Sequence, residues 1–348
     1  MEFNYFLTSY MPDMGVGGKR HFDNMVELAQ AADRLGFKAV SLPEHHLINL
    51  LLMPSPLQMA VKIAAVTKNI DIVTAVAVLP IRDMRVFAGE LTQADILCDG
   101  RLVLGVGRGA FAYEIERLGV PMETTRERLD ESLSVLQALL EGEDVSWDGK
   151  YYQFDPITVM PRPMRPIPMM MAVMVPEGIY HCAKRGFHIQ TTVLSATNET
   201  LLECVQSFHK GKAAAGEAGK DLKLSLQRVV YCARDEADAR EKLQMAYDYY
   251  SRFDNVFSGP GIVEGGAITP LPRKQTVEEL GQNLLICPPD EMIDRLRLYA
   301  DAGIDEVILS SGIGASHEDS LAAMERFATR VMPHYTGRAA FRDAGAAA

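Results

Sequence analysis

Short apolar runs alternate with longer amphipathic stretches along nearly the whole chain. Residues 3–7 form the first apolar run, and residues 21–35 then carry apolar side chains at helical spacing, followed by Gly36. Runs of the first kind predict eight β-strands, at residues 3–7, 38–42, 70–79, 102–106, 168–173, 188–193, 223–233 and 306–309. Stretches of the second kind predict helices at residues 21–35, 57–67, 84–97, 126–140, 176–184, 199–215, 236–253, 290–302 and 318–331.

Eight strands that alternate with helices predict an α/β protein, a parallel (β/α)8 or TIM barrel. A doubly wound open sheet is the alternative, and the number of strands favours the barrel. The segment from Trp147 to Phe154 is expected to form a small hairpin around Asp148 and Gly149.

Residues 255–283 are rich in Gly and Pro and follow the seventh strand and its helix. Because this insertion has no pattern of its own, it is expected to be a mobile lid or, alternatively, a disordered linker. Residues 1–335 are expected to form a single domain that includes the insertion, and residues 336–348 a disordered tail.

The composition narrows the classes of function. The chain has 348 residues, of which 48% are hydrophobic; this is long for one ordinary domain but suits a barrel with an insertion. A formal net charge of −11 without a block of Lys or Arg argues against nucleic acid and membrane partners. No secretory signal or membrane-spanning run stands out. The five Cys are scattered, which predicts reduced thiols and a cytoplasmic protein.

The densest group of titratable residues is Glu44-His45-His46, at the carboxyl end of the second predicted strand. Barrels carry their chemistry at this edge. His45 or His46 can move protons or hold a polar intermediate, with Glu44 as anchor or charge partner. A metal site is a second hypothesis, although the spacing differs from H-E-x-x-H. A hydrogen-bonded loop cluster is the third.

Three further segments suit a bound ligand or, equally, ordinary packing. Gly105–Gly109 ends the fourth strand, where glycines admit a ligand and the Arg108 guanidinium suits phosphate; a tight barrel turn is the alternative. Thr74–Ala77 has small side chains that leave room for a flat ring, or pack in the core. Leu50–Met53 can line a substrate pocket, pack in the core or contact a second subunit.

Taken together and in this order, these motifs resemble the bacterial-luciferase-like flavin-dependent monooxygenases over about residues 1–335. The motifs that carry the resemblance are Glu44-His45-His46, Ser55-Pro56, Leu79-Pro80, Ala94–Leu102, Gly105–Gly109, Pro288–Glu291 and Ala302–Asp305.

The resemblance implies a barrel that binds reduced FMN at its carboxyl-terminal mouth. His45 aligns with the family's catalytic histidine, with Glu44 and His46 beside it. Ala75-Val76 aligns with a non-prolyl cis peptide beneath the flavin ring. The implied cofactor-binding residues are Ala75, Val76, Gly107, Arg108, Met174, Val175 and Gly178, and Arg108 with Met174, Val175 and Gly178 corresponds to the phosphate contacts.

The chain also departs from the luciferases. Met174-Val175 and Gly178 stand where luciferases have a Glu-Ser pair and a later Thr, and Gly107 stands where they have Cys. Backbone N–H groups at a helix start can still bind phosphate. Light emission is therefore not favoured.

The function implied is that of a two-component monooxygenase. A separate reductase supplies FMNH2, and a flavin 4a-peroxide formed with molecular oxygen oxygenates a small, partly apolar organic substrate. The alternative is a deazaflavin-dependent oxidoreductase of the same superfamily, which transfers hydride. A metal-dependent barrel hydrolase and a non-catalytic flavin-binding homologue are further alternatives. The resemblance also implies a homodimer that pairs through about residues 57–67 and 84–97.

Overall fold

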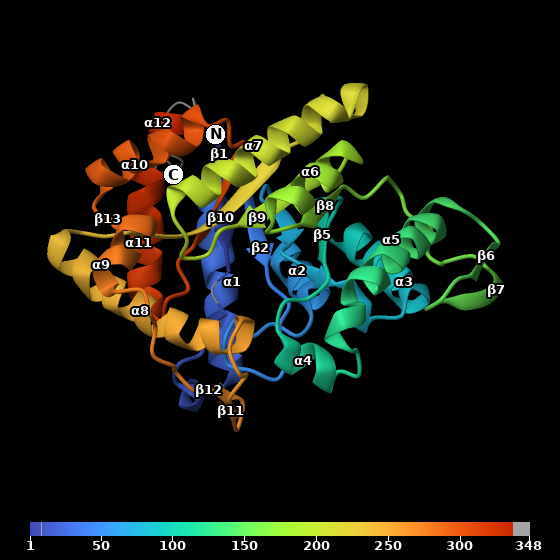
Figure 1. Cartoon of the computed structure of the whole chain (residues 1–348), viewed down its shortest axis with the longest axis horizontal. Helices are drawn as coiled ribbons and strands as arrows, with labels where there is room; N and C mark the ends of the chain where they lie inside the picture. Colours follow the sequence, from blue (N-terminus) through green and yellow to red (C-terminus); the bar gives the residue numbers. More distant parts are fainter. Residues whose placement is uncertain (8, 337–348) are drawn as a thin grey trace, which may run out of the picture.

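A closed barrel of parallel strands forms the centre of the computed structural model, which describes residues 1–7 and 9–336 (Figure 1). Its eight staves are β1 (Glu2–Phe6), β2 (Ala39–Leu42), β3 (Asp71–Thr74), β5 (Leu102–Gly107), β8 (Met169–Ala172), β9 (His188–Thr192), β10 (Leu224–Cys232) and β14 (Glu306–Ser310). Neighbouring staves pair in this order, β14 pairs with β1, and β10 pairs with both β9 and β14. The predicted TIM barrel is therefore confirmed.

Helices surround the barrel because each turns an apolar face toward the strands. In α1, for example, Met25, Leu28 and Ala32 are almost completely buried. The long helices are α1 (Gly18–Arg34), α2 (Pro56–Ala64), α3 (Met84–Leu97), α5 (Thr125–Glu141), α6 (Pro176–Lys184), α7 (Asn198–Ala214), α8 (Glu236–Phe257), α10 (Pro289–Asp301) and α11 (His317–Arg330). The short ones are α4 (Ala112–Arg117), α9 (Val277–Asn283) and α12 (Pro333–Thr336).

The third predicted strand, residues 70–79, is not continuous. β3 ends at Thr74, the Ala75–Val76 peptide bond is cis, and β4 (Ala77–Val78) then pairs with β5. The apolar pattern gave no sign of this break because small and β-branched residues continue through it. The predicted hairpin is confirmed as β6 (Val145–Asp148) and β7 (Gln153–Ile157).

The insertion at residues 255–283 contains regular structure, which contradicts the alternative of a disordered linker. α8 extends to Phe257, β11 (Val263–Glu264) and β12 (Ala267–Ile268) form a hairpin, and α9 begins with a capping box. The side chain of Asn255 closes the base of the hairpin, because it accepts from Ile262 N–H and donates to the carbonyls of Ile262 and Thr269. A further strand, β13 (Leu285–Cys287), was missed and pairs with β10. Movement of the hairpin as a lid stays a prediction.

The end of the domain also differs from the prediction. α12 continues through Thr336, one residue beyond the predicted boundary, and residues 337–348 of the expected tail lie outside the described part of the chain.

The five cysteines are free thiols, and four of them are buried. Burial raises the pKa of the Cys98 thiol to about 11 and that of Cys232 to about 12. Thiols held in the protonated form are poor nucleophiles, so these side chains act as small packing residues.

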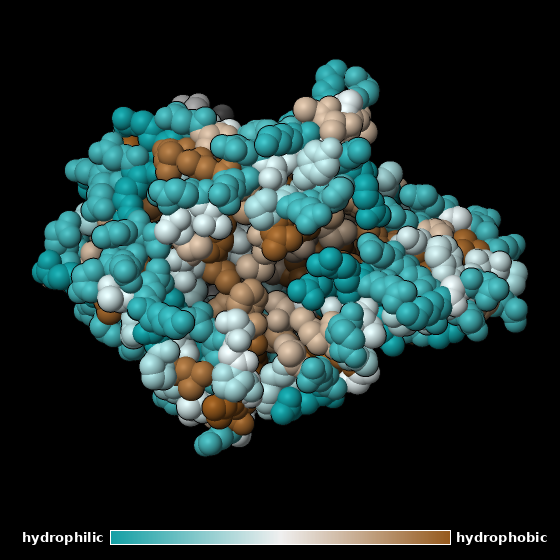
Figure 2. All heavy atoms as spheres, viewed as in Figure 1, coloured by the Kyte–Doolittle hydropathy of each residue, from teal (hydrophilic) through white to brown (hydrophobic). Residues whose placement is uncertain are grey.

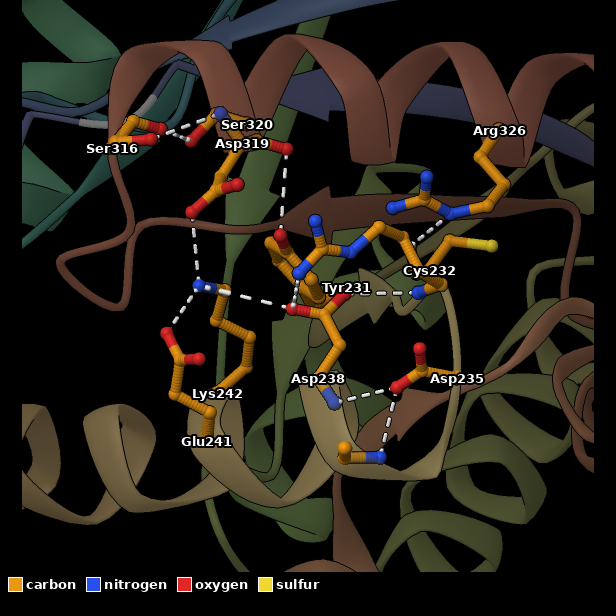
Figure 3. Close-up of polar contacts among 12 residues, drawn as sticks. Tyr231, Cys232, Asp235, Asp238, Glu241, Lys242, Ser316, Asp319, Ser320 and Arg326 are labelled. Atoms are coloured by element: carbon orange, nitrogen blue, oxygen red, sulfur yellow. Dashed lines mark hydrogen bonds and ion pairs between the residues drawn. The ribbon is translucent and has the colours of Figure 1, made fainter.

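A buried lysine joins α8 to α11 beside the carboxyl end of β10 (Figure 3). The Lys242 side chain is 2% exposed, and its Nζ lies 2.9 Å from Asp319 on α11 and 2.8 Å from Glu241. Burial lowers the pKa of Lys242, but the hydrogen bonds with Glu241 and Asp319 outweigh it, so the pKa lies above its usual value. The buried Asp238 carboxylate completes the group at 3.9 Å.

We expect Lys242→Met to lower the free energy of unfolding by about 3 kcal/mol, because it removes a buried cation from the buried Asp238 carboxylate and from the partly exposed Asp319 carboxylate. The hydrogen bond with Lys242 lowers the pKa of Asp319, so this stabilisation exists above the ordinary Asp pKa of about 3.9 and disappears as the pH falls through the lowered value. Urea unfolding across this pH range measures both effects. Exposed Lys210→Met on α7 is the control; equal stability of the two variants would contradict the expectation.

Candidate active site

The predicted site residues lie at the carboxyl ends of neighbouring strands. β2, β3, β5 and β8 are consecutive in the barrel, so their loops leave the same part of its mouth (Figure 1). Glu44–His46 follows β2, Ala75–Val76 follows β3, Arg108 follows β5 and Met174–Gly178 follows β8. The fold therefore brings the separate sequence motifs to one side of the mouth.

Glu44 is a completely buried carboxylate that accepts three hydrogen bonds. Its Oε2 accepts from the backbone N–H of Val78 at 2.9 Å. Its Oε1 accepts from the guanidinium of Arg82 at 2.6 Å and faces His46 Nε2 at 2.9 Å. Both oxygens are therefore occupied, and Glu44 joins the loop after β2 to the residues that follow the cis peptide. This arrangement suits an anchor of the loop.

His46 is held by the same carboxylate. Because an ionised Glu44 only accepts, His46 Nε2 carries the proton in this pair. The backbone N–H of His46 donates in the other direction, to Glu114. The side chain and the backbone N–H of His46 are therefore each held by a buried carboxylate.

His45 pairs with Glu114, a residue that the sequence reasoning missed. The His45 Nδ1 lies 2.7 Å from Glu114 Oε2, and Glu114 on α4 is 4% exposed. The ring of Phe111 stacks on the imidazole at a centroid distance of 4.3 Å, with 28° between the planes. The contacts fix the imidazole at the mouth and engage its Nδ1.

A weak signal for Glu114 was present in the sequence. Phe111, Glu114 and Ile115 follow the glycine turn at i, i+3 and i+4, which places the carboxylate on the apolar face of a short helix. A charge on a buried face requires a partner, and the unpaired histidines after β2 were candidates for it.

The cis peptide between Ala75 and Val76 is present, as the resemblance implied. Glycine suits its neighbour on β5, because a Cβ at Gly107 would lie 2.7 Å from Val76 Cγ2 and would force that side chain to shift. A Cβ at Gly105 would lie 2.0 Å from the Thr74 carbonyl oxygen. The glycines of this turn therefore allow β3 and β4 to approach β5 closely.

The residues predicted to contact phosphate lie on the loops that follow two neighbouring strands, β5 and β8. Arg108 is exposed, and its guanidinium lies 3.4 Å from Thr125 Oγ1. α6 begins at Pro176 after Val175, which provides no side-chain cap, so backbone N–H groups near Gly178 remain available in the first turn. A helix start of this kind attracts anions.

The mouth is strongly apolar. Hydrophobic side chains gather in a hollow at the centre of one face, between α8, α4 and α6, with hydrophilic residues around it (Figure 2). Below the surface, Phe111 packs edge-on against Phe253 of α8 at 5.4 Å. Burial raises the pKa of Tyr250 to about 12, which reflects poor access of water. Leu50, Leu51 and Met53 are buried, which fits packing.

The metal hypothesis has no cluster to support it in the part of the chain that is described. Within residues 1–7 and 9–336, His, Cys, Asp and Glu side chains do not come together in threes as a metal site would require. Over the same residues, the structure contains no helix that is both long and apolar enough to span a membrane.

The fold is a parallel barrel with the Glu44–His46 and Glu114 cluster at its strand ends, and comparison with known proteins identifies the family. The luciferase-like monooxygenase family matches residues 1–306. The flavin-dependent trigonelline monooxygenase, oxygenase component, of Acinetobacter baylyi is 30% identical over 332 residues, or 91% of each chain. The F420-dependent glucose-6-phosphate dehydrogenase of Nakamurella multipartita is 25% identical over 303 residues, covering 82% of this chain and 85% of that protein.

A solved structure agrees in fold. Monooxygenase RslO1 from Streptomyces bottropensis superposes with a TM-score of 0.81 at 23% identity, covering 97% of this chain and all of the other (100%). The chain belongs to the luciferase-like monooxygenase family, as its motifs indicated, and is an oxidoreductase.

We expect Glu44→Gln to lower the free energy of unfolding by about 2 to 4 kcal/mol. The amide introduced at residue 44 must turn its N–H2 group toward one of the groups that donate to the carboxylate. Arg82 also loses the negative charge that it pairs with. Urea unfolding measures the loss. Glu90→Gln is the matched control, because Glu90 is an exposed carboxylate on α3, near the same loop. An unfolding midpoint equal to that of the control would show that Glu44 is not the anchor.

Proposed function

We propose that this protein is the oxygenase of a two-component system that uses reduced FMN and molecular oxygen to oxygenate a small, partly apolar organic substrate. The observation that carries the proposal is the placement of His45, held by Glu114, on the loop next to Ala75 and Val76, where the Ala75 N–H donates to the Leu42 carbonyl. The relative of which 91% is covered is named as the oxygenase component of a flavin-dependent monooxygenase, which favours a separate reductase.

The residues at the mouth fit a flavin. Ala75 and Val76 are half-buried, so a ring can reach them, and Gly107 keeps the adjacent strand close. Arg108 and the start of α6, with Met174, Val175 and Gly178, provide positive charge and N–H groups for a phosphate. Reduced FMN, when bound, supplies the electrons that activate oxygen.

The protein's own contribution is positioning, proton transfer and exclusion of water. His45 Nδ1 is engaged by Glu114, so Nε2 is the nitrogen that can accept or donate a proton at a reacting atom. The aromatic side chains around Phe111 and Phe253 keep water from that atom. Glu44 and His46 hold the loop on which His45 lies.

A second candidate is hydride transfer with the deazaflavin F420. The relatives include an F420-dependent dehydrogenase, and the phosphate contacts at Met174–Gly178 rely on backbone rather than on polar side chains. Relative affinity for the two cofactors distinguishes the candidates.

We also propose that the protein is cytoplasmic, and the free state of all five thiols supports this.

We expect the protein to bind FMN more tightly than F420 and to slow the reoxidation of reduced FMN by oxygen, because the apolar mouth excludes water. His45→Asn should retain FMN binding but shorten the time that reduced FMN takes to return to oxidised FMN. Stopped-flow absorbance of the returning oxidised flavin measures this, with exposed His334→Asn as the control. Binding of F420 without binding of FMN would favour the second candidate, and binding of neither would remove both.

We also propose that two copies of the chain pair through α2 and α3. A groove of about 610 Å³ lies between these helices, and its lining includes Leu57, Val61 and Leu97, the last 51% exposed. Glu44 and His46 line the same groove. A second copy seated there would cover the outer side of the histidine loop, so the proposal links dimer formation to the site.

Sedimentation equilibrium tests the pairing. We expect a dimer for the unaltered protein and a monomer for Leu97→Glu, since the substitution places a charge in an apolar contact. Leu298→Glu, at a similarly exposed apolar position on α10, should leave the dimer intact. A monomeric unaltered protein would contradict the proposal.

A further inference from the structure

We propose that Glu114 is a positioning residue that fixes the tautomer of His45, with the proton on Nδ1 and the lone pair on Nε2. The proposal rests on the proposed role of His45 in catalysis, but the tautomer itself is a property of the protein without cofactor or substrate. The two can therefore be tested separately.

The hydrogen bonds of the Glu114 carboxylate determine where the proton lies. One oxygen accepts from the backbone N–H of His46, which can only donate. The other lies 2.7 Å from His45 Nδ1. An ionised carboxylate accepts at both oxygens, so Nδ1 carries the proton. The two adjacent residues thus hold the carboxylate in a single orientation.

The ring cannot turn over to exchange its nitrogens without losing these contacts. Phe111 covers one face of the imidazole, and the backbone N–H of His45 donates to the Met53 carbonyl at 3.2 Å. The side chain of His45 is 16% exposed. Across residues 1–7 and 9–336, the hydrogen bond of the imidazole is the one at Nδ1, which leaves Nε2 for a ligand.

The glycine turn after β5 delivers the carboxylate to this place. Gly109 adopts a φ of +82°, and a Cβ there would lie 2.5 Å from Ile115 Cδ1, so the chain turns sharply into α4. Phe111 caps α4, and its carbonyl accepts from Glu114 N–H at 3.1 Å. The turn that was considered for phosphate therefore also orients the partner of His45.

The two carboxylates of the site engage opposite nitrogens of the two histidines. Glu44 takes Nε2 of His46, whereas Glu114 takes Nδ1 of His45. His46 is therefore left with Nδ1 as its free nitrogen and His45 with Nε2. His46 lines the outer groove, whereas His45 stacks on Phe111, and this difference in position favours His45 for the reaction.

The substitution Glu114→Gln should reverse the tautomer. The amide oxygen must face the N–H of His46, so the amide N–H2 faces His45 Nδ1, which then has to accept. The proton moves to Nε2, and the lone pair is lost from the free edge. A wrong tautomer of this kind costs orders of magnitude in rate where histidine acts as a base.

The experiment is nitrogen NMR of protein labelled with 15N-histidine, at a pH where the imidazole is neutral, with His45→Asn to assign the signals. We expect a protonated Nδ1 and an unprotonated Nε2 in the unaltered protein, the reverse in Glu114→Gln, and no change in Glu116→Gln. Glu116 is the matched control because it lies on the same helix and is exposed. A protonated Nε2 in the unaltered protein would overturn the proposal even if the variant did not fold.

Kinetics then separate this proposal from the proposed function. Once a substrate is known, Glu114→Gln should lower kcat by on the order of 10²-fold or more, with little change in KM or FMN affinity. An unchanged tautomer in Glu114→Gln would overturn the positioning role. A reversed tautomer with unchanged turnover in both Glu114→Gln and His45→Asn would leave the tautomer assignment in place and overturn the proposed function of His45.

Discussion

The site depends on one buried carboxylate. Glu44 accepts from Val78 and Arg82, which follow the cis peptide, and from His46 on the histidine loop. A carboxylate without exposure to water is stable only when its oxygens are satisfied. The loop after β2 and the segment after β3 therefore have to keep the same relative position, and His45 inherits that position from its neighbours.

A second buried carboxylate, Glu114, orients the His45 imidazole on this loop. Gly109 makes the turn into α4, α4 carries Glu114, and Glu114 holds His45 and the backbone of His46. Phe111 on the same turn completes the environment of the imidazole. The orientation of the His45 imidazole therefore depends on the backbone of the glycine turn, through α4 and Glu114.

The alternation of apolar runs and amphipathic stretches predicted the barrel because burial on both sides of a parallel strand leaves a clear pattern. Residues 42–46 were placed correctly at a strand end for the same reason. Glu114 was missed because its partner lies 69 residues away in the chain, and no local pattern shows such a contact. β13 was missed because it is only three residues long. The hairpin of β11 and β12 was missed because residues 255–283 are rich in Gly and Pro, which are typical of irregular segments. The capping box at Thr276 and Glu279 was a visible sign of α9.

We propose that the two carboxylates position His45 beside a flavin bound at Ala75 and Val76, and a crystal structure of the protein with FMN can show this. We expect the flavin ring against Ala75 and Val76, the phosphate between Arg108 and the start of α6, and the Nε2 edge of His45 facing the ring. A flavin bound elsewhere, or a His45 whose Nε2 faces away from it, would contradict this proposal.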